Sequence, residues 1–319
     1  MSIDTLVKKI NKEIDSKILR PLAELEPIDP IPFGIPTLDE LTGIGGVPRG
    51  RITELYGTES SGKSSLCLSL VAEAQKLGLL CAFIDMEMAL TKELATKFGI
   101  DMKQLIYSEP DTGEEALQVI SELMENEVKL IIVDSVSRLT PEDELEADFD
   151  EHSIGLQARL VSKGMRKLIP PAFRHNVALV FINQLRDDIG KMGFGPKTTT
   201  SGGRALRYYS SLRLKVARKD WLKKGDATVG MTVVVSSEKN KMAPPRLNTE
   251  MEFFFEDGFD RVGNLLTHLV NTKVVTELAK TYYHGDKEIG KAKEAIEYIK
   301  KNYDYKTRQL RSEPSTNTK

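Results

Sequence analysis

Residues 57–64 have the sequence GTESSGKS, and this stretch decides the fold of the chain. It matches the pattern G-x-x-x-x-G-K-[ST] and lies between the apolar run ITELY (52–56) and the helical segment KSSLCLSLVAEA (63–74). A strand, a glycine-rich loop and a helix in this order place backbone N–H groups around a phosphate at the helix N-terminus. The sequence therefore predicts an α/β protein that binds a nucleoside triphosphate.

The side chains of this loop have distinct expected roles. Gly57 and Gly62 permit the tight turn, Lys63 neutralises the β- and γ-phosphates, and the Ser64 hydroxyl ligates Mg²⁺. The further nucleotide contacts that we predict along the loop are Thr58, Glu59, Ser60, Ser61 and Ser65.

Beyond the loop, short apolar runs alternate with amphipathic helical patterns. The runs are at 52–56, 80–84, 130–133 and 177–182, and the helical patterns are at 63–77, 91–98, 113–126 and 155–168. This alternation predicts a mostly parallel sheet covered by helices on both faces. Two alternating runs, 211–216 and 228–235, predict further strands of the same sheet.

Acidic residues follow two of the predicted strands, at the sheet edge where ligands of open α/β sheets bind. Asp134 ends the run 130–133 and fits a second, Mg²⁺-associated acid; the alternative is a cap at a strand–loop junction. Asp85 and Glu87 follow the run 80–84, and strand alternation would point both to the same side. We predict that Glu87 is the general base for the attacking water. The alternative is a charge that precedes the next helix.

Composition excludes several classes of protein. The 319 residues are 40% hydrophobic and 29% charged, which is typical of a globular chain. The longest apolar runs are too short to span a membrane, and the N-terminal MSIDTLVKKINKEID lacks the apolar stretch of a secretion signal. We therefore expect a cytoplasmic protein without a membrane partner, in which Cys67 and Cys81 are reduced and buried.

Charge is unevenly distributed, although the formal net charge is only −2. Residues 85–156 contain 19 acidic and 5 basic side chains, whereas residues 157–246 contain 19 basic and 5 acidic ones. The second block is either a basic face for a polyanion or an ordinary solvated surface, and charge alone leaves both possibilities open.

The ends of the chain differ from its centre. Residues 3–18 follow Ser2 with the spacing of an amphipathic helix, and prolines between 19 and 36 predict a linker. Helical patterns return at 262–270 and 287–302. We expect an N-terminal arm of one helix and a linker (1–34), a nucleotide-binding core (35–260), and a short C-terminal α+β domain with a polar tail (261–319).

Several segments in register resemble the RecA family of bacterial and phage recombinases. They are GTESSGKSSL, AFIDMEMAL, SEPDTGEEALQ, IIVDSVSRLTP, GLQARLVSKGMRKL, FINQLRDDIG, TTTSGGRALRYYSSLRL and EKNKMAPP, in this order within residues 35–295. The resemblance implies a core that polymerises as a helical filament on single-stranded DNA and binds ATP with Mg²⁺ between subunits. It also implies strand exchange with a homologous double-stranded DNA.

The resemblance also implies roles for individual residues. The family's catalytic glutamate and its Mg²⁺-associated aspartate fall on Glu87 and Asp134, in agreement with the argument from strand ends. Its γ-phosphate-sensing glutamine falls on Gln184, at the end of the predicted strand. Lys239 and Lys241 match the paired lysines that reach the ATP of the neighbouring subunit.

Two loops, about 146–156 and 185–207, correspond to the family's DNA-binding loops. The contact positions that the resemblance implies are Arg159, Ser162, Arg166, Arg186, Ile189, Gly202, Gly203 and Arg204. Glycines and threonines in the second loop suit a flexible segment that approaches phosphates closely. The alternative for the arginines is a solvated helix surface. Ile154 and Ile189 are candidates for wedging between bases, and Ile154 suits a core position equally well.

Some positions depart from the family pattern. Leu94 replaces the tyrosine that stacks on adenine in many relatives, Ser64 replaces a threonine, and the first loop is unusually acidic. Tyr208 matches a position that couples ATP to a subunit interface, although it and Tyr209 suit the core of a β-run. His152, His175, His268, His284 and Trp221 form no ligand pattern, and no function is assigned to them.

Two other functions stay open on sequence alone. One is a recombinase paralogue or mediator that has lost strand exchange, and the other is an ATP-driven scaffold filament without DNA. The complete set of catalytic residues argues against the first, and the basic block argues against the second.

Overall fold

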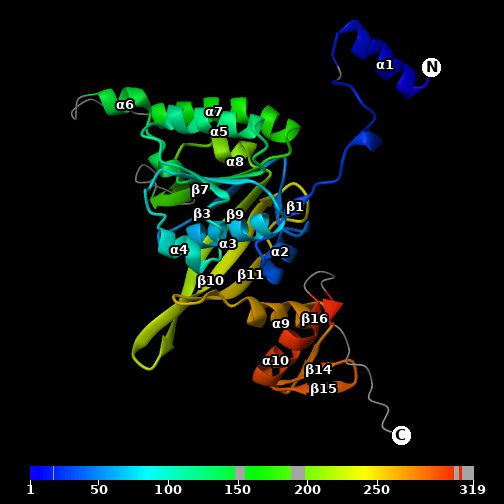
Figure 1. The fold of residues 1–319 in the computed structure, drawn as a ribbon, viewed down its shortest axis with the longest axis vertical. Helices are drawn as coiled ribbons and strands as arrows, with labels where there is room; N and C mark the ends of the chain where they lie inside the picture. Colours follow the sequence, from blue (N-terminus) through cyan, green and yellow to red (C-terminus); the bar gives the residue numbers. More distant parts are fainter. Residues whose placement is uncertain (17, 148–154, 188–197, 305–308, 311–319) are drawn as a thin grey trace, which may run out of the picture.

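A computed structural model gives the fold and describes residues 1–16, 18–147, 155–187, 198–304 and 309–310. A large sheet crosses the molecule, with helices on both faces (Figure 1). In order of pairing, its strands are β12 (Gly258–Phe259), β11 (Asn248–Phe254), β10 (Ala227–Asn240), β9 (Leu212–Lys224), β3 (Ile52–Gly57), β7 (Ala178–Asp187), β6 (Leu130–Asp134), β4 (Cys81–Asp85) and β5 (Leu105–Ser108). Outside this path, β8 (Thr198–Thr200) pairs with β7.

The sheet is mostly parallel, as predicted, with an antiparallel extension. All pairs from β5 to β9 are parallel, and β9, β10, β11 and β12 pair antiparallel. At the centre, Gly57 of β3 lies opposite Gln184 of β7 and Val216 of β9. The register therefore places the end of β3, where the phosphate loop begins, between two neighbouring strands.

The two faces of the sheet carry separate apolar cores. On β6, Leu130 and Ile132 pack on one face, and Ile131 and Val133 pack on the other. Helices α2 (Pro36–Leu41), α3 (Lys63–Lys76) and α4 (Lys92–Lys97) cover the first face, and α5 (Gly113–Glu125), α7 (Leu156–Arg174) and α8 (Ala205–Tyr209) cover the second (Figure 1). Burial on both faces explains why these strands are apolar throughout.

Two shorter elements follow β6. These are the 3₁₀ helix η2 (Val136–Arg138) and the short helix α6 (Glu142–Glu146). They place Ser137 and Arg138 just beyond the end of β6, next to the phosphate loop.

Several element boundaries differ from the prediction. Helix α7 continues to Arg174 through Pro170 and Pro171, because Pro171 and Ala172 are buried against the core and this packing offsets the missing N–H donors. Residues 287–290 form strand β15 instead of the start of a helix, since Ile289 enters the C-terminal core. Strand β11 was not predicted. The two further strands predicted at 211–216 and 228–235 are present as β9 and β10, and both are longer than predicted.

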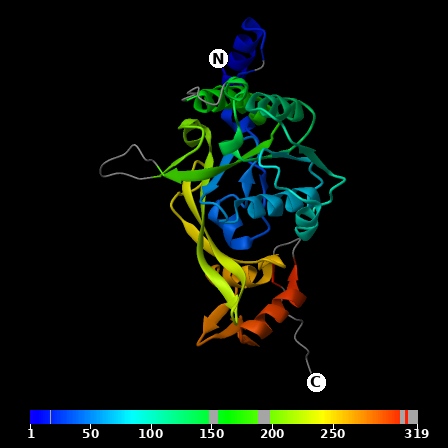
Figure 2. The same ribbon diagram turned by 90° about the vertical axis from the view of Figure 1, so that its left-hand side faces the viewer.

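Helix α1 (Ile3–Glu13) and the C-terminal elements that follow residue 260 lie at opposite ends of the molecule (Figure 2). Helix α1 (Ile3–Glu13), which Ser2 caps, stops five residues earlier than predicted and has no buried residue. It leads through η1 (Leu22–Glu24) to β1 (Pro30–Ile31), which pairs with β2 (Val47–Pro48).

The C-terminal part has its own apolar core, formed by α9 (Arg261–Asn271), α10 (Ala292–Asn302) and a small sheet. The sheet consists of β13 (Thr276–Leu278), β14 (Thr281–His284) and β15 (Lys287–Gly290), and a separate pair is β16 (Tyr303–Asp304) with β17 (Gln309–Leu310). Across the described ranges, none of the helices has the length and apolarity that a bilayer crossing requires.

Candidate functional site

The phosphate loop connects β3 to α3 and is shaped by close contacts. A Cβ atom on Gly57 would lie 1.9 Å from the carbonyl oxygen of Val216, and Gly62, the N-cap of α3, has φ +95°. Both positions therefore require glycine. The buried Oγ atom of Ser61 has no hydrogen-bond partner among the described residues, so the loop retains a polar atom for a ligand.

The side chain of Lys63 contacts the backbone of this loop. Its Nζ atom donates hydrogen bonds to the carbonyl oxygens of Thr58 (2.7 Å) and Gly57 (3.3 Å). Burial lowers the pKa of Lys63, and the nearby acids Asp134 and Glu87 oppose that shift. The ammonium is thus tied to the loop backbone and surrounded by carboxylates.

Asp134 ends β6 beside the start of α3, as the sequence predicts. The Ser64 hydroxyl donates a hydrogen bond of 2.6 Å to its Oδ2 atom. Burial raises the pKa of Asp134 to about 6, and the hydrogen bond from Ser64 partly offsets this shift. A hydroxyl and a carboxylate are oxygen ligands that suit Mg²⁺, which takes few protein ligands and completes its shell with water and phosphate oxygens.

Glu87 faces this pair from the loop after β4. Its Oε1 atom accepts hydrogen bonds from Gln184 Nε2 (2.9 Å) and from the Ser135 hydroxyl (2.6 Å). The Ser135 oxygen is also 2.5 Å from the oxygen of Ser137. Ser135 and Ser137 were missed by sequence reasoning, although both lie within three residues after Asp134, in the segment DSVS.

Asp85 has a different role from Glu87, and the prediction that they point the same way is wrong. The Asp85 carboxylate is buried and accepts hydrogen bonds from the N–H groups of Glu87, Ala89 and Leu90, and from the Tyr107 hydroxyl. Strand β4 ends at Asp85, so the alternation does not continue to Glu87. Asp85 therefore holds the loop that carries Glu87.

Gln184 and Arg186 lie within β7, which continues to Asp187 instead of ending at Gln184. Their spacing of two places both side chains on one face of the strand. Both line a cavity of about 920 Å³ above the phosphate loop. Its other lining residues are Glu59, Ser60, Ser61, Gly62, Lys63, Ser64, Ser65, Glu87, Asp134, Ser137, Arg138, Thr140, Ile182, Trp221, Met231 and Phe255.

A buried polar cluster, which was not predicted from the sequence, lies on the opposite face of the same sheet. Arg213 Nε donates to Glu54 Oε2 at 2.5 Å, and Asn183 Nδ2 donates to Glu54 Oε1 at 3.0 Å. Asn183 also donates to the carbonyl of Ser201 and accepts from the N–H of Gln184. Asn183 therefore connects the strand that carries Gln184 with the segment before Gly202.

The described part of the second predicted DNA loop is more ordered than expected. Residues 198–200 form β8, where the sequence predicts a flexible loop. A Cβ atom on Gly202 would lie 3.0 Å from Val136, and one on Gly203 would lie 3.0 Å from Ala158, so this segment packs closely on η2 and α7. Ile189 and Ile154 lie outside the described residues.

The predicted DNA contacts do not lie in one place. Ser162 of α7 and Arg204, the N-cap of α8, line one pocket of about 500 Å³ together with Tyr208. Arg159 lines a different groove, between α5 and α7, and Arg186 lines the cavity of the phosphate loop. Arg166 is exposed on α7, four residues after Ser162.

Neither Lys239 nor Lys241 is among the residues that line the cavity of the chain's own phosphate loop. Lys239 Nζ donates to the carbonyl oxygens of Arg207 (2.7 Å) and Tyr208 (2.9 Å), which end α8, and Lys241 is exposed. Burial and the charge of Lys241 lower the pKa of Lys239. Tyr208 and Tyr209 belong to helix α8, so their assignment to a β-run is wrong, and Tyr208 is 66% exposed.

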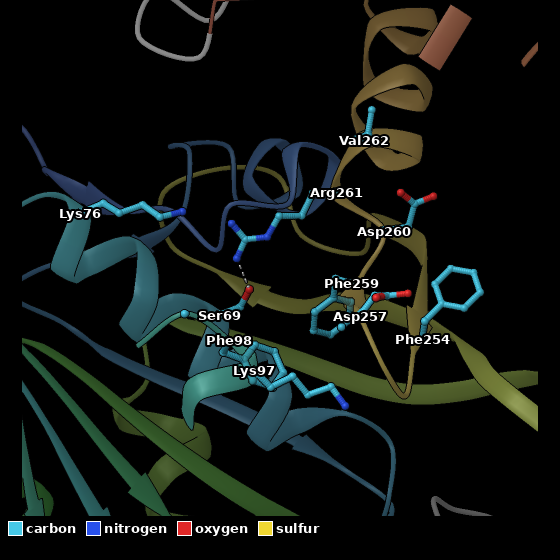
Figure 3. Close-up of a pocket in the computed structure, with 12 residues that line it drawn as sticks. Ser69, Lys76, Lys97, Phe98, Phe254, Asp257, Phe259, Asp260, Arg261 and Val262 are labelled. Carbon is cyan, nitrogen blue, oxygen red and sulfur yellow. Dashed lines mark hydrogen bonds between the residues drawn. The ribbon is translucent and has the colours of Figure 1, made fainter. Parts of the chain in front are cut away.

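A second cavity, of about 590 Å³, lies between α3, α4 and the start of α9 (Figure 3). Arg261 crosses it and donates to the Ser69 hydroxyl at 2.9 Å and to Glu73. Asp260 caps α9 through the N–H of Gly263. These contacts join the C-terminal part to α3.

Comparison with known proteins gives a consistent family. The family described as RecA N-terminal domain matches residues 1–260. "Protein RecA" of Wolinella succinogenes is 42% identical over 305 residues, which cover 94% of this chain and 87% of that protein. The proteins of the same name from Nautilia profundicola and Aquifex aeolicus are 43% and 41% identical, over 94% and 92% of this chain and 87% and 86% of their own lengths.

Proposed function

The chain belongs to the RecA family of recombinases, and from this premise we propose that it is a DNA-dependent ATPase that forms a helical filament on single-stranded DNA. The filament pairs its strand with a homologous duplex and exchanges strands during recombination and DNA repair. The division into an arm (1–34), a core (35–260) and a C-terminal domain with tail (261–319) belongs to this proposal, as does a cytoplasmic location.

The arrangement of Glu87 opposite the Ser64–Asp134 pair is the observation that carries the ATPase proposal. Ser64 and Asp134 would hold Mg²⁺, which when bound supplies positive charge to the phosphate oxygens. Lys63 meets the phosphate charge at the loop. Glu87, exposed and held by Gln184 and Ser135, takes a proton from the attacking water.

Contacts of Gln184 and Asn183 support a link between nucleotide and DNA. Gln184 contacts Glu87, its N–H binds Asn183, and Asn183 binds the carbonyl that precedes Gly202. A bound γ-phosphate could accept the hydrogen bond that the Gln184 amide otherwise donates to Glu87. A shift of Gln184 would then be transmitted through Asn183 to the second DNA loop. Arg204 and Ser162 line one pocket next to that loop and would contact phosphates.

Two features of the surface support assembly. No residue of α1 is buried, and apolar side chains such as Ile3 (68% exposed) and Leu6 (41% exposed) suit contact with a neighbouring subunit. Lys239 and Lys241 do not line the cavity of the chain's own phosphate loop and suit the ATP of a neighbour, in the way of an arginine finger supplied in trans.

Measurement of ATP hydrolysis with and without single-stranded DNA tests the proposal. We expect DNA to stimulate turnover in the wild-type chain and Lys63→Ala to abolish ATP binding. Hydrolysis that is independent of DNA, in a protein without single-strand affinity, would support a scaffold filament instead. DNA-stimulated hydrolysis without strand exchange would support a mediator.

Mixed filaments test the contribution of the neighbouring subunit. The double variant Lys239→Ala, Lys241→Ala should bind ATP but hydrolyse it poorly. Mixing it with Lys63→Ala subunits, which supply intact lysines, should restore part of the turnover. Absence of rescue at every mixing ratio would contradict an intersubunit site.

A further inference from the structure

The cavity above the phosphate loop has two chemically different ends. One end is polar and holds Asp134, Glu87 and Gln184. The other end is formed by Trp221, Met231 and Phe255, which come from β9, β10 and the turn after β11. The phosphate loop and the start of α3 adjoin both ends: Ser64 donates to Asp134 at the polar end, and a Cβ on Gly62 would lie 3.4 Å from the Cε atom of Met231 at the apolar end.

This difference between the two ends gives a bound nucleoside triphosphate a direction. The terminal phosphate belongs at the polar end, because Lys63 and Ser64 contact the loop and Asp134 there. The other end of the nucleotide, which carries the aromatic base, then faces the apolar end of the cavity. Apolar surface near aromatic rings is the environment in which a base is bound most favourably.

Trp221 and Phe255 form an aromatic pair at that end. Their ring centroids are 6.3 Å apart at 67°, an edge-to-face contact. Strand pairing holds both rings: Trp221 lies opposite Met231 in the β9–β10 register, and the N–H of Phe255 donates to the carbonyl of Val229 on β10. The two rings are nevertheless 47% and 40% exposed, so much of their surface is open to a ligand.

Arg218 adds a cation to the pair. Its guanidinium carbon lies 4.0 Å from the centre of the Trp221 ring, which orients the indole. Leu94, in contrast, packs against the apolar core and is not among the residues that line the cavity. Among the described residues, the aromatic surface available to a base in this cavity is therefore that of Trp221 and Phe255.

We propose that Trp221, supported by Phe255 and Arg218, binds the nucleobase of the nucleoside triphosphate by stacking. This inference rests on the proposed ATP binding and assigns to Trp221 a role in affinity and base selection. A stacked contact depends on ring area, so the larger purines bind better than pyrimidines. The contact contains no group that reads the edge of adenine, so ATP and GTP differ little in affinity.

The test compares ligands with and without a base. Binding of Mg–ATP, Mg–GTP, Mg–CTP and inorganic tripolyphosphate to the full chain is measured by isothermal titration calorimetry. We expect Trp221→Ala to weaken ATP binding about 5- to 150-fold, the range of one aromatic–base stack, and to leave tripolyphosphate binding unchanged. Trp221→Phe should retain most of the affinity, and Phe255→Leu should lose a smaller part than Trp221→Ala.

A matched control is available on α7. Phe173 is 44% exposed beneath Arg51, whose guanidinium carbon is 4.8 Å from the ring centre, and it lies outside the cavity. Phe173→Ala should leave both affinities unchanged. Trp221 is the only tryptophan of the chain, so its fluorescence should change on addition of ATP but not of tripolyphosphate.

The outcomes separate this inference from the proposed function. Normal ATP affinity of Trp221→Ala would overturn the base contact and leave the phosphate site intact. An equal loss of ATP and tripolyphosphate affinity would also overturn it, because the substitution would then act by distorting the phosphate site. A wild-type chain that binds neither ligand would overturn ATP binding itself. Preference for CTP over ATP would also contradict stacking on Trp221.

Discussion

Asn183 and Gln184 are neighbours on β7, yet they belong to two very different polar clusters. Asn183 joins Glu54 and Arg213 in a cluster that is almost inaccessible to solvent. Gln184 joins Glu87 in a cluster that opens into the cavity of the phosphate loop. The pleat of the strand sends adjacent side chains to opposite faces of the sheet. One face therefore holds polar groups that bind each other, and the other holds groups that are available to a ligand.

The difference in exposure between the two clusters distinguishes residues that stabilise the fold from residues that can take part in chemistry. In the buried cluster, charges are removed from water and depend on each other. In the open cluster, each side chain retains access to solvent and can exchange its partner for a phosphate oxygen or water. Substitutions in the first should change stability, and substitutions in the second should change turnover.

The largest effect is expected in the open cluster, from Glu87→Gln. The amide has nearly the same shape but cannot accept the proton of the attacking water, so DNA-stimulated turnover should fall about 10²- to 10⁴-fold. ATP affinity and the unfolding temperature should stay unchanged. Steady-state hydrolysis and a thermal melt measure both quantities, and equal turnover in variant and wild type would contradict the role of Glu87.

The corresponding change in the buried cluster is Arg213→Met. It leaves the Glu54 carboxylate buried without its cation, which should lower the free energy of unfolding by about 3–5 kcal/mol. Denaturant titration measures the loss. Adding Glu54→Gln to Arg213→Met should recover part of it, because the buried charge is then removed.

An exposed ion pair provides the control for this comparison. Lys219 and Glu250 are 2.8 Å apart and half exposed, so Lys219→Met should produce no measurable change. If Lys219→Met and Arg213→Met lowered the free energy of unfolding by similar amounts, burial would not explain the stability contribution of the Glu54–Arg213 pair.

A third substitution sharpens the contrast, because it should stabilise the chain while removing function. The pKa of Asp134 is raised to about 6 from an ordinary value of 3.8, so its ionisation opposes folding. The loss of stability that ionisation of Asp134 causes is absent below pH 4, grows as the pH rises from about 4 to 6, and is complete at pH 7. Asp134→Asn should therefore raise the free energy of unfolding at pH 7 by about 1–3 kcal/mol.

Denaturant titrations at pH 4 and pH 7, without nucleotide and with a metal chelator, test this expectation. The difference between Asp134→Asn and wild type should be present at pH 7 and nearly absent at pH 4. A variant that is less stable than wild type at pH 7 would contradict the argument.

The smallest effect is expected from surface cations that belong to neither cluster. Arg204→Ala should leave stability unchanged and reduce the slope of log K against log salt for single-stranded DNA by about 0.7, the share of one phosphate contact. Arg174→Ala, at the far end of α7, is the matched control and should leave the slope unchanged. Equal slopes in all three proteins would place the DNA elsewhere.

Much of the core architecture was predictable because its signals are local. The loop 57–64, the buried strands and the acids that follow them appear as short patterns, and parallel strands bring their carboxyl ends to one edge. The structure accordingly places Ser64, Glu87, Asp134 and Gln184 around one cavity. Their catalytic roles remain predictions.

Other features had no local signal. Strand β9 continues past residue 216 to Lys224, where most of its side chains are exposed and the alternation that marks a half-buried strand is lost. Ser135 became visible only through its contact with Glu87, 48 residues away in the chain. The partners of Lys239 are backbone carbonyls, which any sequence would supply.

The sequence by itself determined the phosphate loop, the α/β core and the family, because each depends on the spacing of residues along a short stretch. The tertiary structure alone decided that Glu54 pairs with Arg213, 159 residues away, and that Trp221 meets Phe255 beside the phosphate loop. A charge inside the run ITELY, or a lone tryptophan in a basic hairpin, has no partner until strand order and register are known. Pairing across a sheet is a property of the assembled strands, and no local pattern encodes it.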